Sequence, residues 1–318
     1  MKIVILDAYP ANPGDLSWDP VRALGDLTVY EHCPHEPEET IRRCAGAEIV
    51  LTNKVPFTRD IMRALPGLRL IALQSTGYNI VDLAAAKELG ITVCNVPGYS
   101  TMPVAQLVFA FILAFKNGVT VFDDAAKKGF WSQAPDFTFY PRPVFELDGS
   151  TLGIFGFGAI GQTVGRIGAA FGMKILYAAR SDKEFPFAER VEPDRLLAES
   201  DILTLHAPQT QQTACFINER TLKLMKPSAI LINTARGGLV DSRALADALN
   251  GGRLAGAGID VLEQEPPPAD HPLLHAKNIL LTPHVGWASA EARGRLIRIL
   301  AENIRAFQAG APIHVVNP

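Results

Sequence analysis

The sequence predicts an α/β protein made of two doubly wound parallel-sheet domains with a cleft between them. First, 318 residues are too many for one ordinary core and suit two domains. Second, short β-branched runs alternate with helical stretches, and strands spaced by helices form parallel sheets. Third, a long apolar helix and an irregular segment divide this alternation into two series. Each series therefore predicts a sheet of its own.

The predicted elements follow one another in two blocks. The first block has strands at residues 3–6, 28–30, 49–52, 68–73 and 91–94. An apolar stretch at 104–115 then predicts a buried helix, because it is much shorter than the roughly 20 residues that a membrane span needs. Residues 129–143, rich in aromatic side chains and proline, predict an irregular approach to the second block. The second block has strands at residues 151–155, 174–178, 201–205, 229–233, 258–262 and 278–281.

The end of the chain predicts a return to the first domain. Residues 288–307 place apolar side chains at helical spacing and predict one long amphipathic helix. The tail at 312–316 is too short for a domain of its own, so we expect it to pack on the first one. The expected domains are therefore 1–98 with 288–318, and 99–287. Two crossings between domains favour a hinge and a cleft.

Composition and charge exclude several classes of function. A net charge of −3, without blocks of like charge, gives no surface for nucleic acid or an anionic membrane. The first residues have no cleavable signal architecture. Four cysteines form no CxxC pair and no Cys/His cluster, so neither disulfides nor a metal site is expected. The sequence therefore favours a cytoplasmic protein that binds a small molecule.

A glycine motif follows the first strand of the second block. Gly156, Gly158 and Gly161 form a G-x-G-x-x-G pattern between a predicted strand and a predicted helix. Gly156 permits a tight turn, Gly158 lets a pyrophosphate approach the backbone, and Gly161 lets helix and strand pack closely. Helix N–H groups around Ala159 and Ile160 face the phosphates. The context predicts a Rossmann-type dinucleotide-binding domain rather than an ordinary glycine turn.

The next strand ends where such folds contact the adenosine ribose. Ala179, Arg180 and Ser181 lie about 20 residues beyond the glycines. An acid here would bind the 2′-hydroxyl of NAD, whereas arginine and a hydroxyl bind the 2′-phosphate of NADP. Ala179 is not an acid, so the sequence favours NADP. NAD stays open as the alternative, with Asp182 supplying the ribose contacts.

Three later strand ends carry an arginine, an acid and a histidine. Arg236 suits a bidentate grip on a carboxylate and polarises an adjacent carbonyl. His284 exchanges the proton that accompanies a hydride, and Glu265 orients this histidine and favours its charged form. Each residue alone has an ordinary structural explanation, as an ion pair, a loop acid or a strand-end histidine. Together, on the cofactor edge of one sheet, they predict an active site.

These residues also resemble a known family over nearly the whole chain. The sequence is similar to the D-isomer-specific 2-hydroxyacid dehydrogenases, in particular the glycerate dehydrogenase or hydroxypyruvate reductase type. Ala179 departs from the family, since most members carry an acid there. The resemblance rests on QSTGYN at 74–79, NVPGYST at 95–101, the glycine loop, LHAP at 205–208, NTARGG at 233–238, DVLEQEPP at 260–267 and PHVGWA at 283–288.

The resemblance implies catalysis by Arg236, Glu265 and His284, and a homodimer formed through the cofactor domains. It implies a flavodoxin-like substrate domain whose loop at Ser75, Thr76 and Gly77 binds the substrate carboxylate. Arg236, His284 and Trp287 also face the substrate, although Trp287 is explained nearly as well by packing. The predicted cofactor contacts are Gly156, Gly158, Ala159, Ile160, Gly161, Arg180, Ser181, His206, Pro208, Thr234, Ala235, Asp260, whose partner is the nicotinamide carboxamide, and Gly286.

The expected reaction is hydride transfer between NAD(P)H and a small 2-keto acid, giving the D-2-hydroxy acid. Hydroxypyruvate with D-glycerate is the favoured pair, and glyoxylate is the nearest other substrate. Two alternatives stay open. One is a broad 2-keto acid reductase of the D-lactate type, because the sequence does not define what lies beside the substrate's third carbon. The other is a protein that senses a dinucleotide without catalysis, against which the Arg/Glu/His set argues.

Overall fold

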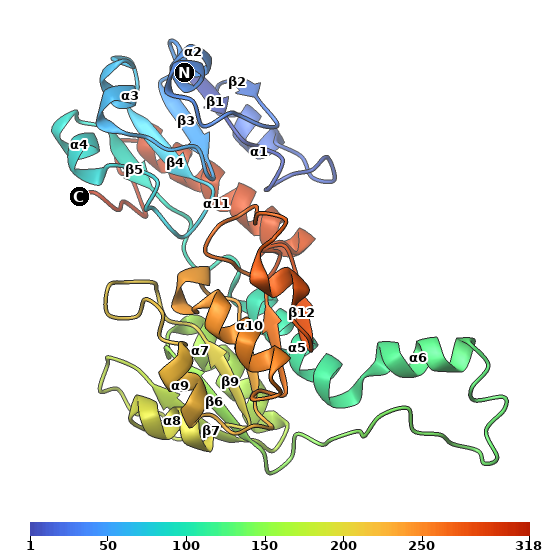
Figure 1. The fold of residues 1–318 in the computed structure, drawn as a ribbon. Helices are drawn as coiled ribbons and strands as arrows, with labels where there is room; N and C mark the ends of the chain where they lie inside the picture. The colour runs from blue at the N-terminus through green and yellow to red at the C-terminus, as the bar shows by residue number, and fades with distance from the viewer. The chain divides into compact units, whose positions relative to one another are not determined.

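We describe a computed structural model of the chain, which covers all 318 residues. Internal contacts divide it into two compact units. Unit 1 comprises Met1–Ser100 and Trp287–Pro318, and unit 2 comprises Thr101–Gly286. Each unit is a layered α/β body with its own parallel sheet, so the predicted fold class is confirmed (Figure 1).

Unit 1 is built on a five-stranded parallel sheet with the order β2-β1-β3-β4-β5. This is the strand order of flavodoxin-like folds. Its strands are β1 (Lys2–Ile5), β2 (Asp26–Val29), β3 (Ile49–Thr52), β4 (Leu70–Leu73) and β5 (Thr92–Cys94). Its helices are α1 (Asp19–Arg22), α2 (Pro37–Cys44), α3 (Arg59–Arg63), α4 (Leu83–Glu88) and α11 (Ala290–Gln308).

Helix α11 and the tail close the sheet of unit 1. Leu296, Leu300 and Ile304 recur at intervals of four on α11 and are fully buried against the core of this unit. After the helix the chain runs beside β5. The amide of Val316 donates to the carbonyl of Val93 at 2.9 Å. The last residues of the chain therefore cover an edge strand that would otherwise be open.

Unit 2 is built on a seven-stranded parallel sheet with the order β12-β11-β10-β9-β6-β7-β8. Its strands are β6 (Thr151–Phe155), β7 (Lys174–Ala178), β8 (Glu189–Arg190), β9 (Ile202–Leu205), β10 (Ile230–Asn233), β11 (Gly256–Ile259) and β12 (Ile279–Leu281). Its helices are α5 (Thr101–Asn117), α6 (Val119–Lys127), α7 (Ala159–Ala170), α8 (Pro193–Glu199), α9 (Glu219–Leu224) and α10 (Ser242–Asn250), with 3₁₀ turns η1 (Gly237–Leu239) and η2 (Pro272–His275).

The apolar helix α5 is a core helix of unit 2, as its composition predicts. It packs on β10, β11 and α7. Gly256 and Gly258 make room for it on β11, since a Cβ on either would press into the ring of Phe115 or Phe111. No single helix of the chain is both long and apolar enough to cross a membrane; only α5 and α6 taken together pass, and a bend of 52° separates them.

Three details differ from the prediction. Strand β8 was missed because its two residues, Glu189 and Arg190, are exposed and charged and leave no apolar signal. Helix α6 was not predicted either. Strand β11 ends at Ile259, earlier than the predicted 258–262, because Asp260 and the residues after it already form the loop that carries the site. Residues 129–143 contain no helix or strand, as predicted.

Candidate functional site

The glycine loop of unit 2 has three glycines with three different requirements. Gly156 has φ +93°, and a Cβ there would overlap the backbone of Ala207. A Cβ on Gly161 would overlap the carbonyl oxygen of Gly156. A Cβ on Gly158, in contrast, would meet no atom of the chain within 4 Å. The folded chain itself thus requires Gly156 and Gly161, whereas Gly158 leaves open a space beside the helix start.

That space lies at the N-terminus of α7, which begins at Ala159. No side chain caps this end of the helix, so its first N–H groups remain for an outside acceptor. A hydroxyl also lacks a partner at the same sheet edge, since Thr234 Oγ1 is buried and makes no hydrogen bond. These features fit a dinucleotide. The space at Gly158 and the uncapped N-terminus of α7 suit its phosphates, and the unpaired hydroxyl of Thr234 suits a polar group of the ligand.

The carboxyl end of β7 carries exposed basic and hydroxyl side chains. Arg180 and Ser181 are both exposed there. Asp182 is engaged by Arg190, whose guanidinium lies 2.6 Å from its carboxylate. The other terminal nitrogen of Arg190 donates to the carbonyl of Ala179 at 3.4 Å. Two guanidinium groups therefore stand at this strand end, and Asp182 already has a cationic partner.

His206 and Pro208 follow β9, and the backbone of His206 and Ala207 lies against Gly156 of the glycine loop. The amide of His206 donates to the carbonyl of Phe155 at 2.7 Å, which ties this loop to β6. Thr204 Oγ1 lies 2.9 Å from His206 Nε2. Burial lowers the pKa of the His206 imidazole to about 3. This imidazole is therefore neutral at physiological pH and offers hydrogen bonds rather than a positive charge.

Arg236 is presented by a loop that a buried asparagine shapes. Asn233, at the end of β10, is fully buried. Its Nδ2 donates to the carbonyl of Arg236 at 2.8 Å, and its Oδ1 accepts from the amide of Ala235 at 3.1 Å. The guanidinium itself is exposed and bonds only to the carbonyl of Ala235. The backbone at Arg236 is thus fixed, while its guanidinium group is available to bind an anion from outside the chain.

Asp260, which follows β11, holds the loop of the histidine. Its Oδ1 accepts from Thr282 Oγ1 at 2.5 Å and from the amide of Val285 at 2.9 Å. Its Oδ2 accepts from the amide of Gly286 at 2.9 Å. Burial raises the pKa of this carboxyl, and the three hydrogen bonds oppose that rise. Asp260 therefore braces the segment around His284, in addition to the predicted cofactor contact.

Glu265 and His284 form a direct pair. His284 Nδ1 lies 2.6 Å from Glu265 Oε2, while Glu265 Oε1 accepts from the amide of Leu262 at 3.0 Å. His284 has φ +54°, a left-handed conformation that is costly for a histidine. The amide of His284 donates to the carbonyls of Asp260 and Thr282, and so holds this conformation. Nδ1 is committed to the glutamate, which leaves Nε2 for proton transfer.

Arg236, Glu265 and His284 belong to one edge of one sheet. The strands that precede them, β10, β11 and β12, are consecutive parallel neighbours. Their carboxyl ends therefore lie side by side, on the edge where doubly wound folds bind ligands. Arg236 can bind a carboxylate, and the imidazole of His284 can donate a proton to a neighbouring carbonyl oxygen. Together they can bind and protonate a keto acid.

The glutamate–histidine pair makes a prediction about proton transfer. In Glu265→Gln a neutral amide replaces the carboxylate that binds His284 Nδ1, and a charge-assisted hydrogen bond is roughly twice as strong as a neutral one. The less firmly oriented imidazole should lower kcat for the 2-keto acid by about tenfold. Steady-state kinetics of the two proteins measure this loss. Glu219→Gln, on an exposed acid of α9, is the matched control, and an unchanged kcat in Glu265→Gln would show that proton transfer does not need the pair.

The predicted substrate loop lies in unit 1, after β4. Thr76 Oγ1 donates to the carbonyl of Val96, and Ser75 Oγ donates to the carbonyl of Gly77. These two side-chain hydrogen bonds hold the loop in place. The backbone amides of Thr76 and Gly77 have no hydrogen-bond acceptor in the chain. Trp287 packs on the core of the same unit, edge-on to Tyr99 with ring centroids 6.1 Å apart. Its observed contact is thus a packing one.

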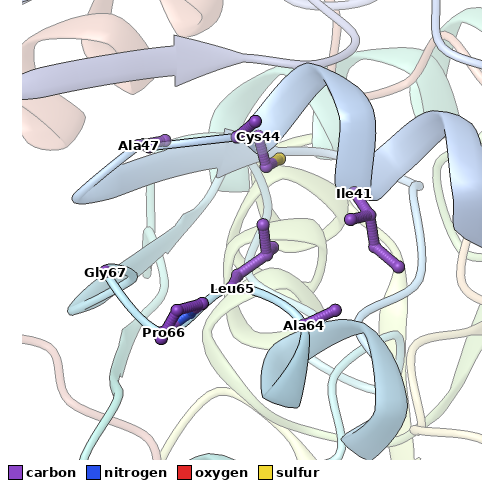
Figure 2. A pocket seen from close by; sticks show the side chains of 9 residues that line it. Ile41, Cys44, Ala47, Ala64, Leu65, Pro66 and Gly67 are labelled. Carbon is purple, nitrogen blue, oxygen red and sulfur yellow. The ribbon is translucent and has the colours of Figure 1, made fainter.

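A hollow of about 210 Å³ in unit 1 is unrelated to these residues (Figure 2). It is lined by apolar side chains such as Ile41 and Leu65, with no charged group. It lies beside the residues that precede β3 and β4, at the amino edge of the sheet. Burial raises the pKa of its one thiol, Cys44, to about 12, so this thiol is not a nucleophile.

No group of three or more His, Cys, Asp or Glu side chains in the chain could hold a metal.

Sequence reasoning missed several residues that shape the site. The sequence marks Asn233 only within the NTARGG motif, although an asparagine at the end of a buried strand is a signal of a shaped loop. Arg190 was missed together with β8. Ser242, Glu263 and His271 were missed because their contacts join residues 21 and 8 positions apart, and no spacing rule connects them.

Known proteins resemble this chain along its whole length. The D-isomer specific 2-hydroxyacid dehydrogenase, NAD binding domain, matches residues 109–286. The chain is 42% identical to a hydroxypyruvate reductase of Blautia hydrogenotrophica, with 100% of each chain covered. It is 43% identical to a glycerate dehydrogenase of Methylorubrum extorquens, over 92% of this chain and 95% of that protein.

Solved structures with the same fold carry both forms of the cofactor. An acyclic imino acid reductase in complex with NADPH and D-Arg superposes with a TM-score of 0.87 at 33% identity, over 99% of this chain and 100% of that one. A D-lactate dehydrogenase with NAD⁺ from Lactobacillus jensenii has a TM-score of 0.82 at 27% identity, with 99% of each chain covered.

Proposed function

Since this chain belongs to the D-isomer-specific 2-hydroxyacid dehydrogenase family and is therefore an oxidoreductase that uses a nicotinamide dinucleotide, we propose that it reduces hydroxypyruvate to D-glycerate. We expect glyoxylate to be the substrate with the next highest kcat/KM. Unit 2 is the cofactor domain in this proposal, and unit 1 is the substrate domain.

The observation that carries the proposal is the strand edge where Arg236, Glu265 and His284 follow three adjacent strands. Arg236 binds the substrate carboxylate and polarises the neighbouring carbonyl. His284, held by Glu265 at 2.6 Å, donates a proton to the carbonyl oxygen. The nicotinamide, when bound, supplies the hydride, and the open space at Gly158 fits its pyrophosphate.

A panel of 2-keto acids, assayed with NADPH and NADH, tests the proposal. Hydroxypyruvate should give the highest kcat/KM, glyoxylate the next, and the product should be the D isomer. Higher efficiency with pyruvate or a bulkier acid would favour a broad D-lactate-type reductase instead. Binding of the dinucleotide without turnover of any acid would favour a sensor.

NADP is the proposed cofactor because of the charges at the end of β7. Arg180 and Ser181 are exposed, and no acid stands at Ala179 to repel a phosphate. Asp182, the residue that would favour NAD, is paired with Arg190 at 2.6 Å. The exposed guanidinium of Arg180 is thus offered to a 2′-phosphate, while Arg190 offsets the charge of Asp182.

Replacing Arg180 by alanine should raise the KM for NADPH and leave that for NADH nearly unchanged. A charge-assisted hydrogen bond contributes about 1.5–3 kcal/mol, and exposure of Arg180 reduces this, so we expect a rise of about tenfold. Ala179→Asp should shift preference toward NADH, because its carboxylate repels the phosphate and accepts from the ribose hydroxyl. If the unmodified enzyme already used NADH as efficiently as NADPH, the proposed preference would be wrong.

We also propose a homodimer formed through unit 2. Helix α6 and the segment after it extend away from the sheet of this unit (Figure 1). They expose large apolar side chains, among them Phe137 at 85% and Tyr140 at 73%. Such a concentration of exposed aromatic rings is typical of an interaction surface. Light scattering should give a mass near twice 34.4 kDa, and a monomer mass would contradict the dimer.

A further inference from the structure

One carboxylate outside the proposed catalytic set joins three segments of unit 2. Ser242 Oγ donates to Glu263 Oε2 at 2.7 Å, and His271 Nε2 lies 3.2 Å from Glu263 Oε1. Ser242 and His271 are 6% and 5% exposed. Both oxygens of Glu263 are therefore held by buried partners, one from the start of α10 and one from the turn before η2.

The hydrogen bonds fix the direction of this link. The Nδ1 of His271 accepts from the amide of Leu273 at 3.3 Å, so the hydrogen of the neutral imidazole is on Nε2. His271 thus donates to Glu263, as Ser242 does. The carboxylate receives two donors and needs no ionised histidine to keep its place.

Backbone packing places this link between the two loops of the proposed site. Gly237 directly follows Arg236, and a Cβ there would overlap the carbonyl of Leu262 and the amide of Glu263. The loop after β10 therefore lies directly against the loop after β11. The amide of Leu262 also donates to Glu265 at 3.0 Å. The backbone of Leu262 and Glu263 thus contacts Gly237 on one side, and the amide of Leu262 binds Glu265 on the other.

We infer that Glu263 is a positioning residue that sets the spacing between Arg236 and the Glu265–His284 pair, with Ser242 and His271 holding its carboxylate. The inference rests on the proposed function, since it concerns how that site is aligned. Ser242 lies six residues after Arg236, and Glu263 lies two before Glu265. A hydrogen bond between them joins the two loops by side chains at the place where their backbones meet.

The expected consequence of breaking the link is a misaligned site rather than an unfolded one. Glu263 is 46% exposed, so its loss leaves no large cavity. A displacement of about 1 Å in a positioning element costs up to about 10²-fold in rate. Glu263→Ala should therefore lower kcat/KM for the keto acid by about 10- to 100-fold, while the Kd for NADPH, which binds at β6 and β7, changes less than twofold.

Two variants separate positioning from simple stabilisation. Glu263→Gln keeps an acceptor for His271, and the rotatable Ser242 hydroxyl then accepts from the new amide, so it should recover most of the activity. In an Arg236→Lys background, Glu263→Ala should cost much less than in the wild type, because the arginine fork it aligns is already gone. Glu219→Ala, on an exposed acid of α9, is the control and should behave as wild type.

The outcomes divide clearly. Unchanged kcat/KM in Glu263→Ala, or an additive loss in the Arg236→Lys background, would overturn the inference. A loss of kcat/KM accompanied by an equal fold-loss of NADPH affinity and by a lower Tm would also overturn it, since that pattern belongs to a structural role. If Glu263→Ala does not fold, Ser242→Ala removes one of the two bonds and should show the same pattern at about 3- to 10-fold. A wild-type protein without turnover would instead reject the proposed function.

Discussion

Replacing Arg236 by alanine is expected to lower kcat/KM for the 2-keto acid by about 10⁴-fold. The guanidinium has two proposed tasks: it pairs with the substrate carboxylate and it stabilises charge that develops on the carbonyl oxygen. A hydrogen bond to a charged group is worth about 1.5–3 kcal/mol, and loss of one donor to a developing oxyanion costs about 2.7–4 kcal/mol. Because one side chain supplies both, a single substitution removes both. The Kd for NADPH should change little.

Two further variants make this result specific. Arg236→Lys keeps the charge but not the planar fork, so its loss should be intermediate. Arg220→Ala, an exposed arginine on α9 paired with Asp194, should leave kcat/KM unchanged. Steady-state kinetics with hydroxypyruvate and NADPH fluorescence titration measure both quantities. If Arg236→Ala kept its keto acid KM and kcat, the carboxylate would have to be bound elsewhere.

Much of the fold could be predicted because it depends on local pattern. Buried parallel strands are continuous apolar runs, and the glycine loop announces a strand, a turn and a helix at fixed spacing. Strand β8 carries no such run, since Glu189 and Arg190 are exposed. It exists because β7 leaves an edge to pair with, which is a tertiary condition.

The common location of Arg236, Glu265 and His284 was predictable for a similar reason. Parallel strands bring their carboxyl ends to one edge, so the loops after β10, β11 and β12 must share it. The bracing of that edge was not predictable. Asp260 receives the amides of Val285 and Gly286, and Glu263 receives Ser242 and His271. These contacts depend on loop conformations between strands, which no residue spacing specifies.

His284→Ala is expected to reduce kcat for keto acid reduction by about 10²- to 10⁴-fold, because the carbonyl oxygen then has no proton donor. Dinucleotide affinity should be affected much less, since the glycine loop lies at β6. Turnover of the 2-keto acid at the wild-type rate in this variant would place the proton on another group.

Alanine alone would leave that result open to a second explanation. The histidine backbone is left-handed, with φ +54°, and alanine tolerates this conformation poorly, at about 1–2 kcal/mol. A shifted loop would disturb Val285 and Gly286, which Asp260 holds. Asparagine adopts the left-handed conformation readily, so His284→Asn keeps the loop and removes only the imidazole. If proton donation is the role of His284, both variants must be equally slow; activity restored in His284→Asn would mean that the residue serves the backbone and not the proton.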